Sequence, residues 1–152
     1  MAAPTNWRVF DDFKEQVGLG KHVLGTDTCK MLLISSTAAS PSLSADDVLA
    51  DLAGEVATAT GYARATLTSA TWTQSGSTTT LDFADATFTA NSTGGGFNCK
   101  YAVIYNDTQT SPADPLIAYS NLDNSTGIVS ISAGNTLTVN VTNVFKVTGA
   151  TT

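Results

Sequence analysis

The chain has 152 residues and a formal net charge of −6, and only 13% of its residues are charged. An average soluble domain carries about 25% charged residues, and threonine, serine, alanine and asparagine fill the difference here. The 7 lysine and arginine residues form no basic stripe. This argues against nucleic acid or an anionic membrane as a partner, since both bind clustered cations.

The length favours a single β-rich domain that spans 1–152. A chain of this size buries roughly two-thirds of its unfolded surface, enough for a core without disulfides or metal ions. Its threonine- and serine-rich surface loses little side-chain entropy against a neighbour, which suits tight assembly; an all-β extracellular-type domain without an assembly role is the alternative. No apolar run reaches the ~20 residues that span a bilayer. The start of the chain lacks a charged segment followed by an apolar one, so we expect synthesis in a cytoplasm, or removal of a signal segment.

Two short helices are predicted in the N-terminal third. The first covers 11–17, where aspartates cap the start and Phe10, Phe13 and Val17 share one apolar face. The second covers 45–53, begins after a serine that can act as the N-cap, and ends before a glycine. Because both helices are short and flanked by strands, we expect them to cover a β core.

Strands account for most of the remaining chain. Apolar or alternating runs predict them at 21–24, 29–35, 63–73, 78–84, 86–90, 99–105, 116–119, 127–132 and 137–147, with a turn at 122–126 and an irregularity before 144 in the last strand. A polar loop with two prolines joins strands 99–105 and 116–119, which predicts an antiparallel hairpin. The unbroken apolar run 101–105 predicts a central strand buried on both faces. Short strands with turns at intervals of about 8–12 residues favour a mainly β fold, either an antiparallel β-sandwich or a jelly-roll-like arrangement.

The residue inventory gives little support for catalysis. His22 is the only histidine, and no serine lies in a nucleophile-elbow sequence. We therefore interpret His22 as structural or exposed and expect no enzyme activity. The sequence contains no His/Cys metal site and no cofactor motif. The glycine-rich loop 94–96 lacks the lysine and the helix of a phosphate cradle, and we expect it to be a hinge or an interface loop.

Two other residue types leave alternatives open. Cys29 and Cys99 each begin a predicted strand; they are buried free thiols, or they form a bridge if their strands are neighbours. Three isolated aromatic residues either stack on sugar rings or, as is commoner in β proteins, anchor the core. These residues are Tyr62, Trp72 and Tyr119.

Four stretches occur in a distinctive order along most of the chain, roughly 10–147. They are FDDFKEQVGLGKHVLGTDTCKMLLIS, EVATATGYA, KYAVIYNDT and DPLIAYSNL. In this order they resemble a group of small virion structural proteins of tailed bacteriophages. The resemblance implies a structural component without catalytic residues, and the nearest role is capsid decoration, or cement. Proteins of that kind bind the outside of an icosahedral shell as dimers or trimers and reinforce it against the pressure of the packaged DNA.

The resemblance also implies partners and a location. The expected partners are a major capsid protein and further copies of the chain in a dimer or trimer, on the outer capsid surface of a virion assembled in the host cytoplasm. Possible contact residues lie in an N-terminal arm, 1–10, and in the loop of the predicted hairpin; they are Trp7, Val9, Phe10, Thr108, Gln109, Thr110 and Asp114. Alternatively, the segment 1–10 folds onto its own domain. The alternative function is a tail or fibre adhesin that binds a host through loops 91–96 and 106–114.

Overall fold

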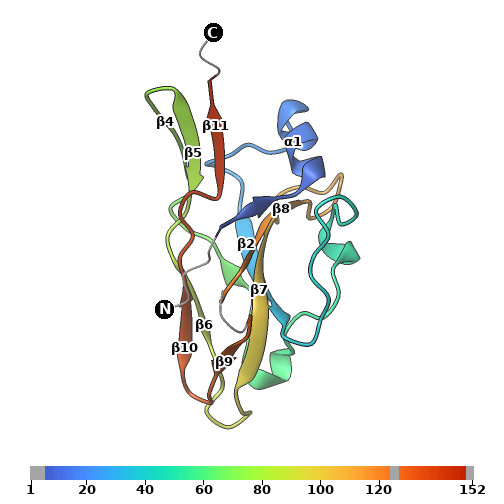
Figure 1. Cartoon of the computed structure of the whole chain (residues 1–152), viewed down its shortest axis with the longest axis vertical. Coiled ribbons are helices and arrows are strands. Elements are labelled where there is room, and N and C mark those ends of the chain that lie inside the picture. Colours follow the sequence, from blue (N-terminus) through green and yellow to red (C-terminus); the bar gives the residue numbers. More distant parts are fainter. Residues whose placement is uncertain (1–5, 124–126, 150–152) are drawn as a thin grey trace.

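The computed structural model describes residues 6–123 and 127–149, and antiparallel strands dominate these residues (Figure 1). The main sheet has the order β1-β8-β7-β2-β3, with β9 paired to β7. Its strands are β1 (Arg8–Val9), β2 (Cys29–Ser35), β3 (Ala65–Thr66), β7 (Phe97–Asn106), β8 (Leu116–Asn121) and β9 (Val129–Ile131). The two smaller sheets consist of β6 (Ala86–Thr89) with β10 (Thr136–Val139), and of β4 (Thr71–Ser75), β5 (Thr78–Asp82) and β11 (Phe145–Thr148). The predicted mainly β, antiparallel, sandwich-like fold is confirmed.

Strand β7 is the centre of the main sheet, as the sequence predicts. Val103 lies opposite Leu32 of β2 on one side and opposite Tyr119 of β8 on the other. Residues 101–106 are all buried. The β7–β8 hairpin is antiparallel. A strand with both faces covered needs apolar side chains at consecutive positions, which explains the unbroken run in this part of the sequence.

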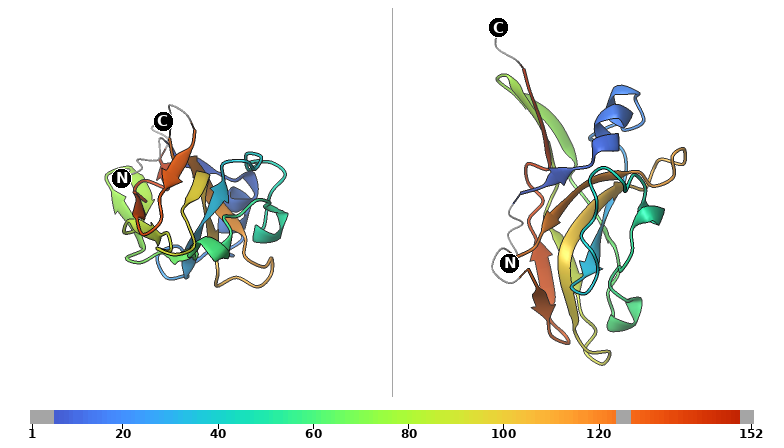
Figure 2. Two further views of the ribbon diagram at one scale, coloured as in Figure 1. Left: turned by 90° about the horizontal axis from the view of Figure 1, so that it is seen from below. Right: turned by 45° about the vertical axis from the view of Figure 1, so that its right-hand side comes forward.

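Two layers cover the main sheet. The β6–β10 pair lies on one side, where Phe88 stacks on Tyr62 with ring centroids 5.9 Å apart, and Tyr62 meets Phe97 edge-on. The first part of the long connection after β2, residues 36–53, runs along the other side (Figures 1 and 2). One hydrophobic core runs through these layers, from Phe10 to Val144.

The sheet β11-β5-β4 projects from the body at the end that also carries α1 (Figures 1 and 2). We call residues 71–82 and 145–148 the projecting sheet. Its base is a row of three side chains in register, Trp72, Leu81 and Phe145. Trp72 stacks on Phe145 at 5.7 Å, and Phe145 meets Phe13 of α1 edge-on at 5.1 Å. This aromatic row fastens the projecting sheet to the helix.

Only one of the two predicted helices forms. Helix α1 (Asp11–Gly18) agrees with the prediction, and buried Phe13 anchors it. The second prediction, 45–53, is wrong. That segment has a turn, a strand-like bridge between Val48 and Pro115, and the short 3₁₀ helix η1 (Leu49–Asp51); a second 3₁₀ helix, η2 (Thr58–Thr60), follows. Its backbone bonds instead to the β7–β8 loop, through Leu49 N–H to the Asp114 carbonyl at 3.0 Å, and to the first residue of β8, through Leu116 N–H to the Asp47 carbonyl at 2.9 Å.

The strand predicted at 63–73 is broken into two, and the irregularity predicted within 137–147 is a complete break; a residue with positive φ lies at each place. Ser69 (φ 54°) separates β3 from β4 within 63–73, and Asn143 (φ 54°) separates β10 from β11 within 137–147. The second break moves the chain from the sheet of β6 to the sheet of β5. The strand predicted at 21–24 is a connection without strand structure. The turn predicted at 122–126 lies partly outside the described residues.

Candidate functional site

The described part of the N-terminal segment folds onto its own domain. Strand β1 pairs with β8, so that Arg8 lies opposite Tyr119 and Val9 opposite Ala118. Phe10 is completely buried, donates its N–H to the Ile117 carbonyl at 3.1 Å and contacts the Tyr119 ring at 5.6 Å. Phe10 is therefore a core residue without surface to offer a partner, which corrects the expectation for this position.

Trp7 and Val9 are partly buried against the core, and each keeps some exposed surface. They lie on the outer side of β8, at an edge of the main sheet. Residues 1–5, the rest of the expected arm, lie outside the described residues.

The β7–β8 loop carries the other four predicted contact residues. Thr108 and Thr110 are exposed, while Gln109 and Asp114 are partly buried. The loop is held from inside by Asp114 N–H, which donates to the Gln109 carbonyl at 3.1 Å, and at its start by Thr108, whose hydroxyl accepts Thr28 N–H at 2.8 Å. The structure thus separates the two groups of predicted contact residues. The N-terminal residues pair along the side of β8, whereas the loop residues precede the first residue of β8.

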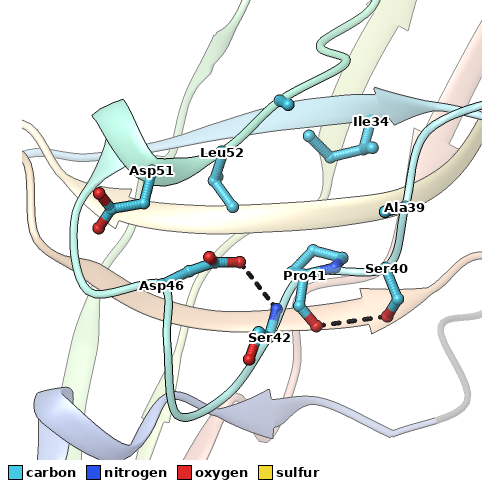
Figure 3. A pocket seen from close by; sticks show the side chains of 9 residues that line it. Ile34, Ala39, Ser40, Pro41, Ser42, Asp46, Asp51 and Leu52 are labelled. Atoms are coloured by element: carbon cyan, nitrogen blue, oxygen red, sulfur yellow. Dashed lines mark hydrogen bonds between the residues drawn. The ribbon is translucent and has the colours of Figure 1, made fainter.

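A pocket of about 170 Å³ lies under the connection 39–53 (Figure 3). Its polar wall holds two carboxylates, and backbone N–H groups already occupy both. Asp46 accepts from Ser42 N–H at 2.7 Å, and Asp51 accepts from Asp47 and Val48 N–H at 3.0 Å each. The bonds from Val48 and Asp47 lower the pKa of Asp51 below its usual value. These carboxylates serve as turn caps and are poorly placed for acid–base chemistry.

A second, more open pocket of about 360 Å³ lies at the C-terminal end of β2, beside Ser35. Its lining is mostly hydroxyl and amide groups, with Glu55 as its one charged side chain. Phe97 and Val56 also line it, but both are almost completely buried. The remaining lining residues are Ser35, Ser36, Thr37, Ala57, Thr60 and Asn98. Such a lining suits an uncharged ligand rich in hydroxyl groups.

A hydrogen-bond network holds Glu55 at the rim of this second pocket. Arg64 donates to both carboxylate oxygens of Glu55, at 2.8 and 2.7 Å. The Tyr62 hydroxyl donates to Glu55 at 3.0 Å and accepts Leu33 N–H from β2 at 2.9 Å. Burial alone raises the pKa of Glu55, but the bonds from Arg64 and Tyr62 together outweigh it and leave the pKa below its usual value. The stability that this carboxylate contributes is present above its unfolded pKa and is lost as the pH falls below that value.

Replacing Tyr62 with phenylalanine is expected to lower the free energy of unfolding by about 1–2 kcal/mol, because the buried Leu33 N–H then loses the hydroxyl that accepts its hydrogen bond and Glu55 loses one donor. The ring would still stack on Phe88. Tyr119→Phe is the matched control, since among the described residues the Tyr119 hydroxyl accepts one long bond, of 3.5 Å, from Arg8. Urea denaturation measures both variants, and equal losses in the two would contradict a special role for the Tyr62 hydroxyl.

The three aromatic residues considered for sugar stacking pack inside the protein, either in the core or at the base of the projecting sheet. Tyr62 and Tyr119 are buried, and Trp72 stacks on Phe145. The two cysteines are free and buried. Although β2 and β7 are neighbours, Cys29 lies opposite Asn106 and Cys99 opposite Ser35, at the two ends of the pairing, so no bridge joins them. Burial raises the pKa of each thiol to about 12, which leaves both unreactive at neutral pH.

Within 6–123 and 127–149, no three aspartate, glutamate, histidine or cysteine side chains gather as metal ligands would. The described residues also contain no helix with the length and apolar character needed to cross a membrane. Comparison with known proteins gave no relative: no protein-family model, no curated protein and no solved structure matches the chain.

Proposed function

We propose that this chain is a structural protein of a tailed-phage virion, a capsid decoration protein that binds the outer shell and stabilises the head. The observation that carries the proposal is the projecting sheet. It extends away from the body of the molecule, and little of the chain covers either of its faces (Figure 2). Most residues of β4 and β11 are exposed. A small sheet gains stability from an apolar face packed on something else, and open strand edges bind other chains readily. An extension of this kind is typical of an element that docks on a neighbour.

The charge of the projecting sheet supports the same proposal. The chain as a whole carries −6, but the projecting sheet contains one acidic residue, Asp82, and one basic residue, Lys146. Its remaining polar side chains are threonine, serine and glutamine. Two copies of an acidic protein, or this protein and an acidic shell, therefore meet here without like-charge repulsion.

Three of the four exposed large apolar side chains among the described residues lie at the end of the molecule that carries the projecting sheet; the fourth, Ile128, precedes β9. Leu19 (62% exposed) and Val23 (53%) follow α1, and Val147 (48%) is in β11. Val147 lies two residues after Phe145, so it points to the face of the projecting sheet on which Phe145 meets α1. A contact surface needs such apolar anchors within a polar surround. We propose that the capsid protein, or a further copy in a dimer or trimer, covers this end.

Counting copies in purified virions tests the proposal. Quantitative mass spectrometry is expected to find hundreds of copies per particle, and particles that lack the protein are expected to lose resistance to heat. A handful of copies located at the tail would overturn the decoration role.

Val147→Asp is expected to weaken binding to undecorated heads by at least about tenfold, because it places a charge in the apolar part of the docking end. Ser130→Asp is the control, since it adds the same charge at an exposed position of β9, at the far end of the molecule (Figure 1). Co-sedimentation of purified protein with heads measures both. Equal binding by the two variants would place the docking surface elsewhere.

A tail or fibre adhesin is the second candidate, and the open pocket at Glu55 and Phe97 favours it. Its hydroxyl and amide lining suits the sugar hydroxyls of a host glycan. A glycan array with the isolated protein tests this role. Binding that Asn98→Ala abolishes, together with a low copy number per virion, would favour the adhesin over the decoration protein.

A further inference from the structure

The only histidine of the chain lies in a buried hydrogen-bond network between α1 and β2. His22 is 6% exposed, and its ring packs on Phe13 with centroids 4.8 Å apart. Its Nδ1 atom lies 3.0 Å from the side-chain nitrogen of Asn106, the last residue of β7. Asn106 is itself buried, and its side chain also reaches Asp27.

The other bonds of Asn106 fix the orientation of its amide. The Asn106 oxygen accepts Thr108 N–H at 3.0 Å, and the nitrogen donates to the Asp27 carboxylate at 2.7 Å. The second hydrogen of the same NH₂ group therefore points at Nδ1 of His22. A neutral imidazole has one donor and one acceptor nitrogen, so Nδ1 accepts and the ring proton lies on Nε2.

Protonation of His22 breaks this arrangement. The new proton on Nδ1 faces the Asn106 NH₂ group, so two donors oppose each other. Turning the Asn106 amide over would not help, because its oxygen would then face the Asp27 carboxylate and its NH₂ group would face Thr108 N–H. Nε2 is buried, and no acceptor in the part of the chain that the structure describes bonds to it, so this nitrogen offers the positive charge no compensation.

We propose that His22, Asn106 and Asp27 form an acid-sensitive latch that ties the connection 18–28 to the start of the β7–β8 loop and opens when His22 is protonated. The loop start depends on the same connection through two more bonds. Thr28 N–H donates to the Thr108 hydroxyl at 2.8 Å, and Asp107 N–H donates to the Thr28 carbonyl at 2.9 Å. Opening the latch therefore loosens Thr108 and the exposed part of the loop. This inference does not rest on the proposed virion role.

The charged groups around the ring set the direction of the pH response. Burial lowers the pKa of His22; Asp27, in the same connection, and Asp12, from α1, raise it but do not outweigh burial. Asp107, beside Asn106, is paired with Lys30 at 2.8 Å. As the pH falls, His22 of the unfolded chain binds a proton near the ordinary histidine pKa of about 6.5, whereas His22 of the folded chain binds it only at a lower pH. Stability therefore falls as the pH drops from neutral towards the folded pKa, by at most about tenfold in the folding equilibrium constant per pH unit.

An NMR titration of the full chain tests the latch directly, because a single histidine gives unambiguous ring signals. We expect the Nε2–H tautomer at neutral pH and a midpoint below that of the unfolded chain. The Thr108 amide is expected to shift and to exchange faster with the same midpoint. A proton on Nδ1, a midpoint at or above the unfolded value, or a Thr108 amide that ignores the titration would overturn the proposal.

Two variants separate the latch from general acid effects. In His22→Asn the amide oxygen takes the place of Nδ1 but does not titrate, so the loss of stability between pH 7 and the folded His22 pKa is expected to shrink relative to the wild type. In Asn106→Asp a carboxylate faces Nδ1, so the midpoint of His22 is expected to move upward. An unchanged midpoint in Asn106→Asp contradicts the latch. If His22→Asn does not fold, the His22 midpoint in Asn106→Asp and the titration of the wild type still test the latch.

Discussion

Replacing Phe13 with alanine is expected to lower the free energy of unfolding by about 3–5 kcal/mol, the range for removing a buried phenylalanine ring. Phe13 is completely buried, and its ring contacts Phe145 of β11 at 5.1 Å and His22 at 4.8 Å. It is the side chain through which α1 holds the base of the projecting sheet. Since domains of this kind have about 5–15 kcal/mol of stability in total, the variant is expected to be only marginally folded. Guanidinium denaturation followed by tryptophan fluorescence measures the loss.

Leu19→Ala is the control for Phe13→Ala, because it also removes a large apolar side chain near α1 but from a position that is 62% exposed. We expect a change within about 0.5 kcal/mol. The fluorescence of Trp72, which stacks on Phe145, is expected to respond to Phe13→Ala and not to Leu19→Ala. A loss below about 1 kcal/mol in Phe13→Ala would mean that the helix contributes little to the projecting sheet.

The sequence predicts the centre of the fold well because local and tertiary preferences agree there. The predicted strand 29–35 coincides with β2, and the hairpin of β7 and β8 follows from two apolar runs around a proline-containing loop. Helix α1 is predicted because one apolar face, Phe13 and Val17, matches the helical period. At each of these places the burial pattern and the turn residues indicate the same structure.

The predicted helix at 45–53 failed because another part of the chain takes its backbone groups. The capping residues and the apolar spacing suit a helix, but Val48 pairs with Pro115, and neighbouring groups bond to the β7–β8 loop. These partners lie more than sixty positions away, where no local pattern points to them. Strand partners were hidden for a similar reason: alternation shows which face of β10 or β11 is inward, but not that they pair with β6 and β5.

The candidate site was only partly predictable. Thr108 and Thr110 are exposed, but Phe10 is a core residue, because its N–H bonds to the Ile117 carbonyl of β8 and its ring packs on Tyr119. The projecting sheet was not foreseen, although one signal was present: β5 begins with three consecutive threonines and so lacks an apolar face before Leu81. The His22 latch depends on Asn106, 84 positions away, and has no local signature.

Gly96→Ala is expected to cost about 3 kcal/mol, the second large effect, because the added methyl group overlaps backbone and not a movable side chain. A Cβ atom at Gly96 would overlap the Ile131 carbonyl oxygen and lie 2.9 Å from the Ile131 carbonyl carbon. Ile131 is the β9 residue paired with Phe97, so β9 must separate from β7 to make room. Gly94 is confined as well, since a Cβ there would lie 2.7 Å from the Ala59 carbonyl oxygen. The loop expected to be a hinge or an interface loop is thus closely packed at two of its three glycines.

Two glycine variants separate overlap from backbone strain. Gly95 has φ +82° but nothing within 4 Å of an added Cβ, so Gly95→Ala is expected to cost only about 1–2 kcal/mol, the strain of a left-handed residue. Gly18, in α1, has open space and no positive φ, so Gly18→Ala is expected to be neutral or to stabilise by up to about 1 kcal/mol. Hydrogen exchange locates the damage, which we expect in the amides that pair β9 with β7 in Gly96→Ala alone. If Gly96→Ala and Gly95→Ala lose equal stability and β9 stays protected, the close approach at Ile131 does not determine the choice of glycine.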